Sequence, residues 1–258
     1  MSNQINVSGK IILVTGGYGH LGKAIVHGLA AHGATVLVIG REQKKFFDSF
    51  GTASDNILFR KGDVSSSSGI EEVFAGIIKD YNKIDVLINN AFYSAGQSPE
   101  FMTDDEWSLG VDGALGSVFR CIRAVIPIMK NQRSGKIINV ASMYGMVAPD
   151  FRAYEQSPSF LNPPHYGAAK AGVIQLTRYY ASYLGLDGIT VNCVSPGPFP
   201  SEAVQADQDF IARLGERTVL GRIGLPEELS GIFVFLSSEA ANFITGQNIA
   251  VDGGWTIR

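Results

Sequence analysis

Short apolar runs alternate with longer segments of helical periodicity along the whole chain. The first run, KIILVT at Lys10–Thr15, ends in glycines and precedes a helical pattern at Leu21–His32, with Gly33 placed just past the helix end. The second run, TVLVI, covers Thr35–Ile39. Runs that are apolar at every position, instead of every second one, are typical of parallel strands covered by helices on both faces.

The same alternation continues to the end of the chain. Five further runs are predicted strands: Ile57–Phe59, Ile84–Ile88, Lys136–Val140, Ile189–Val194 and Asn248–Val251. The remaining helical patterns lie at roughly Ile70–Tyr81, Asp104–Met129, His165–Leu184 and Pro226–Ser237. A repeated strand–helix–strand order predicts a Rossmann-type α/β fold, with a doubly wound parallel sheet of about seven strands and helices on both faces. Neither a repeat nor a linker interrupts it, so we expect one domain over residues 1–258.

Two long segments lack clear periodicity, Met146–Pro164 and Pro196 to about Gly224. Structureless stretches of this length inside a compact domain are usually functional loops. The first lies between two candidate catalytic residues described below. We therefore expect Tyr144, Phe151 or Tyr154 to line a substrate pocket.

Composition and charge limit the classes of binding partner that this chain is expected to have. The chain has 258 residues, a formal net charge of −3 and no run of Lys or Arg, which disfavours nucleic acid and anionic membranes as partners. Cys121 and Cys193 lie in apolar stretches without metal-ligand spacing, so we expect buried thiols and no metal site. The first ten residues have no apolar signal core and no segment is long enough to span a bilayer, so cytoplasmic residence is expected.

A glycine-rich turn joins the first predicted strand to the first helix. Its sequence is Thr15-Gly16-Gly17-Tyr18-Gly19-His20-Leu21-Gly22. Such a turn lets backbone N–H groups approach a pyrophosphate at the positive end of the helix, and a side chain on Gly16 or Gly22 would obstruct this approach. A plain αβ turn is the alternative, and the concentration of glycines between strand and helix disfavours it.

The end of the second strand bears on which nucleotide is bound. A carboxylate there would bind a ribose 2′-OH and repel a 2′-phosphate. This strand ends in Gly40-Arg41, with Glu42 one residue later. We therefore expect NADP, with NAD as the alternative if Arg41 is only a solvated turn residue. Asp63, after the third strand, could hold the adenine ring or cap the next helix.

Three residues form a candidate catalytic group. Tyr166 and Lys170 are four apart at the start of a predicted helix and share one face. A phenol has a pKa of about 10, and a neighbouring ammonium should lower it enough to make Tyr166 a usable acid or base. Ser142 follows a predicted strand at the carboxyl edge of the sheet, where open α/β folds bind their ligands.

Together these motifs resemble the compact, single-domain type of the short-chain dehydrogenase/reductase family over nearly the whole chain. The resemblance is carried by the glycine turn, Asp63-Val64, Asn89-Asn90-Ala91, Ser142, Tyr166 with Lys170, Asn192, Pro196-Gly197, the stretch Gly221–Glu228, Thr245-Gly246-Gln247 and Val251-Asp252-Gly253-Gly254. It implies that Ser142 orients the substrate, that Tyr166 is the general acid/base, and that Lys170 holds the nicotinamide ribose and lowers the Tyr166 pKa. It also implies that residues 196–201 flank the nicotinamide.

The cofactor-binding residues expected from the turn and the resemblance are Thr15, Gly16, Tyr18, Gly19, His20, Leu21, Gly22, Arg41, Asp63, Val64, Asn90, Ala91, Tyr166, Lys170, Pro196, Gly197 and Phe199. Members of the family are commonly tetramers, with the Tyr166 helix and the C-terminal strand region at the interfaces. The resemblance therefore implies a homo-oligomer, a tetramer or a dimer.

Four departures from the family pattern stand out. The glycine spacing T-G-x-x-G-x-x-G resembles that of the longer family branch. Phe92 stands where the family usually has Gly, which suggests an aromatic wall beside the cofactor. Ser142 and Tyr166 are 24 positions apart, wider than usual. The family's catalytic Asn, which holds a water linked to Lys170, falls on Ala114. We expect the backbone near Gly113–Ala114 to form a local helix bulge and hold that water, with the Asp112 and Ser117 side chains as the alternatives.

Three functions are compatible with these residues. The first is an enzyme that interconverts a secondary alcohol and a ketone, which the intact catalytic group favours. A regulator that binds a dinucleotide without catalysis is the second, and Ala114 is the one point for it. An epimerase or dehydratase is suggested only by the glycine spacing. Polar groups in the long loops, Glu155, Gln156 and Asn162, would suit a sugar or polyol as the small-molecule substrate.

Overall fold

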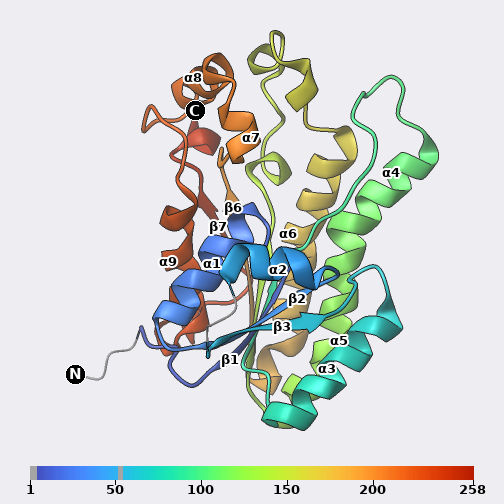
Figure 1. Ribbon diagram of the computed structural model, residues 1–258, viewed down its shortest axis with the longest axis vertical. Helices are drawn as coiled ribbons and strands as arrows, with labels where there is room; N and C mark the ends of the chain where they lie inside the picture. Colours follow the sequence, from blue (N-terminus) through green and yellow to red (C-terminus); the bar gives the residue numbers. More distant parts are fainter. Residues whose placement is uncertain (1–4, 52–54) are drawn as a thin grey trace.

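A computed structural model describes residues 5–51 and 55–258, so the first four residues of the polar N-terminal segment lie outside the described part. The described chain forms one parallel sheet of seven strands in the order β3-β2-β1-β4-β5-β6-β7, which confirms the predicted Rossmann-type fold (Figure 1). The strands are β1 Ile11–Thr15, β2 Thr35–Gly40, β3 Ile57–Lys61, β4 Val86–Asn89, β5 Gly135–Val140, β6 Ile189–Pro196 and β7 Asn248–Val251. Their ends lie within two residues of the predicted ones, and β7 matches its prediction at both ends.

The sheet reverses its winding direction between β1 and β4. The chain moves outward from β1 to β3 and then returns to the other side of β1, where Thr15 on β1 is in register with Asn89 on β4. Ligands of open α/β sheets bind at such a switch point, outside the carboxyl ends of the strands. The glycine turn therefore begins beside the end of β4.

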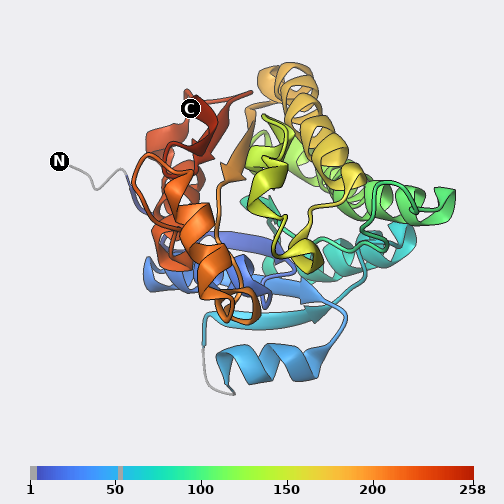
Figure 2. The same ribbon diagram turned by 90° about the horizontal axis from the view of Figure 1, so that it is seen from above.

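Helices cover both faces of the sheet because successive strand residues point to opposite sides. On β1, Leu13 packs into the core shared with α3, α5 and α6, whereas Ile12 and Val14 pack into the core shared with α1, α2 and α9. The two helical layers are seen on either side of the sheet in Figure 2. The α-helices are α1 His20–Ala31, α2 Gln43–Phe50, α3 Ser67–Tyr81, α4 Asp104–Val111, α5 Ser117–Gln132, α6 Pro164–Leu184, α7 Glu202–Gln205, α8 Gln208–Glu216 and α9 Pro226–Ser237.

The prediction of one continuous helix over Asp104–Met129 is wrong in a way that the sequence also suggested. A π-helical turn, Asp112–Gly116, separates α4 from α5. In it the N–H of Ser117 donates to the carbonyl of Asp112, five residues back, instead of four. The expected bulge at Gly113–Ala114 is confirmed.

The sequence did not predict the helices α2, α7 and α8, because they are short. No helix was predicted at α2, whose only buried side chain is Phe46. The segment from Pro196 to Gly224, predicted to be structureless, contains α7 and α8, and α8 buries Phe210 and Leu214. Helices of nine residues or fewer show too few turns for a clear period.

Across residues 5–51 and 55–258, no helix has the length and apolar character needed to cross a lipid bilayer.

Candidate active site

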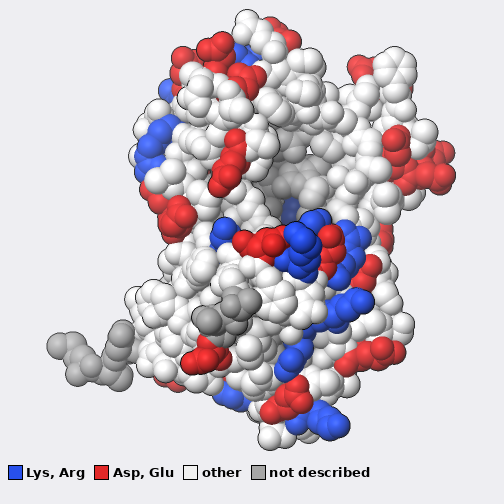
Figure 3. Space-filling view, in the orientation of Figure 1, with Lys and Arg blue, Asp and Glu red and all other residues white. Residues whose placement is uncertain are grey.

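A cleft of about 490 Å³ opens at the carboxyl ends of the strands. In Figure 3 it lies in the hollow of the visible face, and charged side chains gather along the rim formed by α2. Ser142 lines the cleft together with every expected cofactor-binding residue except Thr15. The structure therefore brings together residues drawn from six of the seven strand ends.

Thr15 lies beneath the cleft and does not line it, which corrects its predicted role. Its side chain is only 1% exposed. The Thr15 hydroxyl oxygen accepts hydrogen bonds from the backbone N–H groups of Asn90 (3.0 Å) and Ala91 (3.1 Å). Thr15 thus fixes the chain that follows β4 against the glycine turn, and acts on the cleft through its neighbours.

The glycine turn has the shape of a phosphate cradle. Gly16 has a φ of +63°, and a Cβ there would lie 2.9 Å from the Cα of Ala91. A Cβ on Gly22 would lie 2.5 Å from the carbonyl oxygen of Gly16. Asn90 donates its side-chain amide to this same carbonyl at 3.0 Å. Because the turn excludes side chains at the start of α1, a dinucleotide phosphate fits against its backbone N–H groups.

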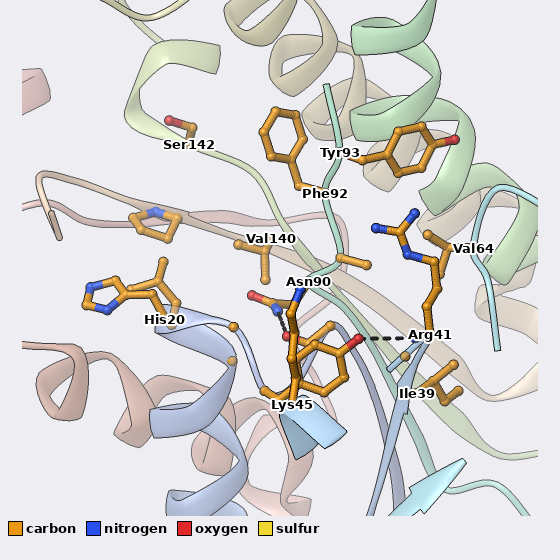
Figure 4. Close-up of a pocket in the computed structure, with 18 of the residues that line it drawn as sticks. His20, Ile39, Arg41, Lys45, Val64, Asn90, Phe92, Tyr93, Val140 and Ser142 are labelled. Carbon is orange, nitrogen blue, oxygen red and sulfur yellow. Dashed lines mark hydrogen bonds between the residues drawn. The ribbon is translucent and has the colours of Figure 1, made fainter. Parts of the chain in front are cut away.

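Tyr18 shapes the end of the cleft next to β2. Its hydroxyl oxygen accepts hydrogen bonds from the backbone N–H groups of Arg41 (3.1 Å) and Glu42 (3.3 Å), and its ring covers Gly40 so closely that a Cβ there would lie 2.3 Å from a ring carbon. In Figure 4 the Arg41 side chain extends toward Val64 and Tyr93, and no carboxylate in the described part of the chain pairs with it. A second cation, Lys45, lines the cleft and pairs with Glu42 at 2.7 Å.

Lys45, Phe92 and Tyr93 also line the cleft, although only Phe92 was singled out from the sequence. Lys45 belongs to the unpredicted helix α2, so no pattern pointed to it. Asp63 lines the cleft as expected and accepts hydrogen bonds from the N–H and the hydroxyl of Ser65. The cap of α3 is Ser66, not Asp63.

Tyr93 connects the cleft to the π-helical turn. Its hydroxyl donates to the carboxylate of Asp112, and the Arg120 guanidinium contacts both Asp112 oxygens at 2.8 Å and the carbonyl of Val64 at 2.8 Å. Burial, with the Asp112 hydrogen bond, raises the pKa of Tyr93 to about 12. The pKa of Asp112 is lowered, chiefly by Arg120. This cluster joins the wall of the cleft at Val64 to the start of the bulge.

The three candidate catalytic residues meet at the inner end of the cleft. Burial raises the pKa of Tyr166, while the neighbouring Ser142 hydroxyl acts in the opposite direction. The expectation that Lys170 lowers the Tyr166 pKa is not met in this geometry, because the Lys170 Nζ donates to the carbonyl of Val140 at 2.7 Å. Lys170 is itself 4% exposed, and burial lowers its pKa to about 8.

Phe92, predicted to form an aromatic wall beside the cofactor, lines the cleft next to the catalytic group. Its ring meets the Tyr166 ring edge to face, with centroids 5.2 Å apart. The Lys170 Nζ lies 5.9 Å from the Phe92 ring centroid and 5.6 Å from that of Tyr166. The lysine is therefore enclosed by two aromatic rings, which favours an ammonium through their negative faces.

A second pocket of about 240 Å³ adjoins the cleft and shares Ser142, Tyr166, Gly197 and Phe199 with it. Its other lining residues are Met143, Tyr144, Tyr154, Phe160, Asn162, Pro198, Pro200, Val204, Phe210 and Leu214. Two of the three residues predicted to line a substrate pocket, Tyr144 and Tyr154, line this pocket beside the catalytic group. The third candidate, Phe151, is 56% exposed and lies outside it.

The segment between Ser142 and Tyr166 is fastened to α8. Arg213 on α8 donates to the carbonyl of Ala153 (3.0 Å), to Gln156 (3.1 Å) and to the hydroxyl of Ser157 (2.8 Å). Ser157 in turn donates to Asp207 at 2.7 Å. In Figure 1 this segment and α8 stand side by side above the sheet. They form one wall of the second pocket.

The bulge uses small residues because the chain after β4 presses against it. A Cβ on Gly113 would lie 1.8 Å from the carbonyl oxygen of Tyr93. The Gly113 carbonyl, which no longer receives the N–H of Ser117, accepts the Ser117 hydroxyl at 2.8 Å instead. Ala114 is fully buried.

The chain is similar to known enzymes over most of its length. Residues 19–256 match the family model described as enoyl-(acyl carrier protein) reductase. The 3-oxoacyl-(acyl-carrier-protein) reductase of Chlamydia trachomatis is 33% identical over 250 residues, which is 95% of this chain and 96% of the relative.

Solved structures agree with this similarity. A short-chain dehydrogenase of Leptospira borgpetersenii with bound NAD+ is 32% identical, with a TM-score of 0.88 over 99% of this chain and 96% of that one. A gluconate 5-dehydrogenase of Burkholderia cenocepacia, in complex with NADP and tartrate, is 28% identical, with a TM-score of 0.87 over 99% and 98%. Relatives of this chain therefore bind either NAD+ or NADP.

Proposed function

The chain belongs to the short-chain dehydrogenase/reductase family of NAD(P)-dependent oxidoreductases that act on CH–OH groups, and we propose that it interconverts a secondary alcohol and a ketone through Ser142, Tyr166 and Lys170. One observation carries the assignment of residues. The cofactor cleft and the second pocket meet at Ser142 and Tyr166, so a substrate in the pocket and a nicotinamide in the cleft would touch at these two side chains.

Each side chain has a distinct part in this reaction. The nicotinamide, when bound, supplies or accepts the hydride. In ketone reduction Tyr166 donates its proton to the carbonyl oxygen, and the Ser142 hydroxyl hydrogen-bonds the same oxygen and orients it. Lys170 holds the nicotinamide ribose, and its ammonium stabilises the phenolate left on Tyr166. In alcohol oxidation the proton moves in the opposite direction.

We propose NADP as the preferred cofactor. Arg41 is free of carboxylate partners in the described part of the chain and lines the cleft at the end of β2, with Lys45 close by on α2. Two cations and a glycine at position 40 suit a 2′-phosphate, whereas an NAD site would offer a carboxylate to the ribose hydroxyls. Glu42 is held by Lys45, which reduces its repulsion of a phosphate.

For the substrate we propose a sugar or polyol. The second pocket is lined by aromatic and apolar side chains with polar groups from Ser142, Tyr144, Tyr154, Asn162 and Tyr166, and none of its lining residues is charged. Aromatic rings pack well against the C–H faces of a sugar ring, while hydroxyl and amide groups pair with its oxygens. An anionic substrate would find no cation in this lining.

We further propose that Ala114 is compensated by backbone. In the π-helical turn the N–H of Ser117 bonds the carbonyl of Asp112 instead of that of Gly113, and the Gly113 oxygen accepts the Ser117 hydroxyl. A carbonyl oxygen has two lone pairs, so it can also hold a water that passes the proton from Lys170 to solvent.

The protein is proposed to work in the cytoplasm as a homo-oligomer, a dimer or a tetramer. Large apolar side chains are exposed on α5 and α6, including Phe119, Tyr179 and Tyr183, and near the C-terminus at Phe243 and Ile257. Exposed apolar patches of this kind commonly mark interfaces. Mass measurement by light scattering would test the proposal, and a monomer at micromolar concentration would contradict it.

The proposed function is tested by initial rates of NADPH oxidation with a panel of ketoses and cyclic polyol ketones. Turnover of at least one member, abolished in Tyr166→Phe and retained in the exposed-site control Tyr179→Phe, is expected. A turnover rate in Tyr166→Phe equal to that of the wild type would contradict the assignment of Tyr166 as the catalytic residue. Faster turnover with an anionic ketone than with every neutral one would contradict the substrate class.

A further inference from the structure

Two buried tyrosine hydroxyls face each other in the second pocket. The hydroxyl oxygens of Tyr144 and Tyr154 lie 2.5 Å apart, and the two side chains are 7% and 4% exposed. Both residues belong to the segment that separates Ser142 from Tyr166. The proposed reaction, which proceeds through Ser142, Tyr166 and Lys170, does not use either of them.

Each ring is held in place from outside the pocket. The Tyr144 ring packs edge to face on Trp255 near the C-terminus, with centroids 6.4 Å apart, and its backbone N–H donates to the Ser142 hydroxyl at 3.2 Å. The Tyr154 ring packs on Phe210 of α8 at 5.5 Å. Because contacts from three parts of the chain fix the rings, the two hydroxyls are oriented before a substrate arrives.

The Tyr144–Tyr154 pair carries one hydroxyl proton more than its hydrogen bonds use. The Asn162 amide donates to the Tyr154 oxygen at 3.3 Å. The two hydroxyls carry two protons, and the bond between them uses one. In the described part of the chain no acceptor receives the other proton. A buried donor without a partner is costly, so the spare proton is poised to bond an oxygen that enters the pocket.

The surroundings of the pair indicate whether the substrate oxygen that accepts this proton is charged or neutral. Burial raises the pKa of Tyr144 far above its ordinary value, so its hydroxyl keeps its proton and acts as a donor at any physiological pH. No charged side chain lines the pocket. Arg213 bonds the segment and Arg217 bonds Asp150 at 2.9 Å, and neither lines the pocket. A carboxylate or phosphate would lose its hydration there without gaining a cation.

We propose that the Tyr144–Tyr154 pair is a specificity element that donates a hydrogen bond to a second, uncharged oxygen of the substrate, while Ser142 and Tyr166 hold the reacting oxygen. This inference rests on the proposed function and narrows its substrate class to neutral ketones and alcohols with an additional hydroxyl, ether or carbonyl oxygen. A site built to bond such an oxygen discriminates against analogues that lack it.

The test measures binding by calorimetry to the complex of the protein with 1,4,5,6-tetrahydro-NADP, an analogue that cannot transfer hydride, because NADP+ would oxidise the secondary alcohol of the hydroxy probes. The probes are cyclohexanone, its three positional hydroxy isomers (2-, 3- and 4-hydroxycyclohexanone) and the anion 4-oxocyclohexanecarboxylate. We expect at least one hydroxy isomer to bind about tenfold more tightly than cyclohexanone, and the anion to bind more weakly than cyclohexanone. Tyr144→Phe and Tyr154→Phe should each reduce the preference for the hydroxy isomer to less than threefold.

Controls separate recognition from structure. Cyclohexanone should bind both variants within twofold of the wild type, because it makes no bond with the pair, and Tyr179→Phe should keep the full preference. Equal binding of all neutral probes, or failure of every hydroxy isomer to bind, would overturn the inference. So would a preference that survives in both variants.

Turnover of the same ketones with NADPH tests the proposed function separately. Selective binding without turnover would contradict the reaction and leave the tyrosine pair standing. Turnover without a binding preference for any hydroxy isomer would support the reaction and contradict the role of the tyrosine pair.

Discussion

The cofactor cleft and the second pocket lie side by side and are built on opposite principles. The cleft offers backbone groups at strand ends, and it depends on missing side chains, as at Gly16 and Gly22. The second pocket offers side chains from irregular segments, above all Tyr144 and Tyr154. Regular elements fix the first, whereas hydrogen bonds and ring contacts between α8 and the segment before α6 fix the second.

This difference indicates where change is tolerated. A Cβ added at Gly16 or Gly22 meets backbone atoms, so the cleft has little freedom to vary at these positions. In the second pocket a side chain can be exchanged without disturbing the sheet, so that region can set substrate choice. Substitutions should therefore affect either cofactor binding or substrate binding, and only residues at the boundary should affect catalysis as a whole.

The largest effect is expected at the boundary itself. Tyr166→Phe removes the proton donor while keeping the ring that packs on Phe92. The kcat should decrease by about 10³-fold or more, while the dissociation constant for NADPH changes only a few-fold. Fluorescence titration and single-turnover kinetics separate the two quantities. A loss of cofactor affinity equal to the loss of kcat would mean that the two regions are not separable there.

Arg41 should act on the cofactor alone. Arg41→Ala removes the cation expected at the 2′-phosphate and should weaken NADPH binding by about 10- to 100-fold, with NADH binding unchanged. Gly40→Asp should reverse the cofactor preference only when combined with Tyr18→Ala, because the Tyr18 ring fills the space that the new side chain needs. Titration of both cofactors decides it. Tighter binding of NADH than NADPH to the wild type would refute the assignment.

Arg213 should act on the substrate alone. Arg213→Ala removes three hydrogen bonds that fasten the pocket wall to α8, so the substrate KM should rise about tenfold while the NADPH affinity stays constant. Arg152→Ala is the matched control, because Arg152 is exposed and bonds only Asp150. Equal KM values in both variants would show that the wall does not need this fastening.

The pH dependence of stability should distinguish the two regions as well. Burial lowers the Lys170 pKa from 10.5 to about 8, so between these values the unfolded chain holds a proton that the folded chain has released. The Lys170 contribution to the unfolding free energy therefore rises with pH above 8, by up to about 1.4 kcal/mol per unit. The buried cysteines, with pKa values raised from 9.0 to about 12, act in the opposite direction above pH 9.

Denaturant unfolding at pH 8 and pH 9 should show this slope as a difference between the wild type and Lys170→Met. The control Lys44→Met, at an exposed lysine of α2, should keep the wild-type slope. Tyr144→Phe should also keep it, because the Tyr144 hydroxyl titrates far above this range. Parallel curves for the wild type and Lys170→Met would contradict the effect of burial on Lys170.

The smallest effect is expected at the bulge. Ala114→Asn restores the side chain typical of the family, and kcat should change by less than about twofold if the backbone already holds the water. Solvent isotope effects on kcat should likewise remain unchanged. A gain of tenfold or more would show that the backbone does not replace the asparagine.

The sequence predicted the cofactor cleft better than the second pocket for a physical reason. Strand ends and glycine turns follow from local apolar runs and from backbone needs, so the sequence alone predicts the places of Gly16, Asp63 and Asn90. Thr15 was misplaced by one layer, because a motif does not state whether a hydroxyl faces ligand or backbone.

The pocket depends on contacts between distant segments, which no local pattern encodes. That Tyr154 points inward while Phe151 points outward is decided by Phe210 and Arg213 about 60 residues later. That the Lys170 ammonium bonds the carbonyl of Val140, at the end of β5, could not be anticipated either, because the spacing of Tyr166 and Lys170 on one helix says nothing about a strand 30 residues earlier. Lys45 could not be anticipated without α2.

The contact of Tyr18 with Gly40 also constrains how this enzyme could evolve. A lineage that changed position 40 first would force a side chain into the Tyr18 ring, and one that changed Tyr18 first would lose the acceptor of two backbone N–H groups ahead of α2. Each single substitution is therefore expected to disturb this end of the cleft unless the other accompanies it. We therefore expect close relatives of this chain to keep the same cofactor preference, even where their substrates differ.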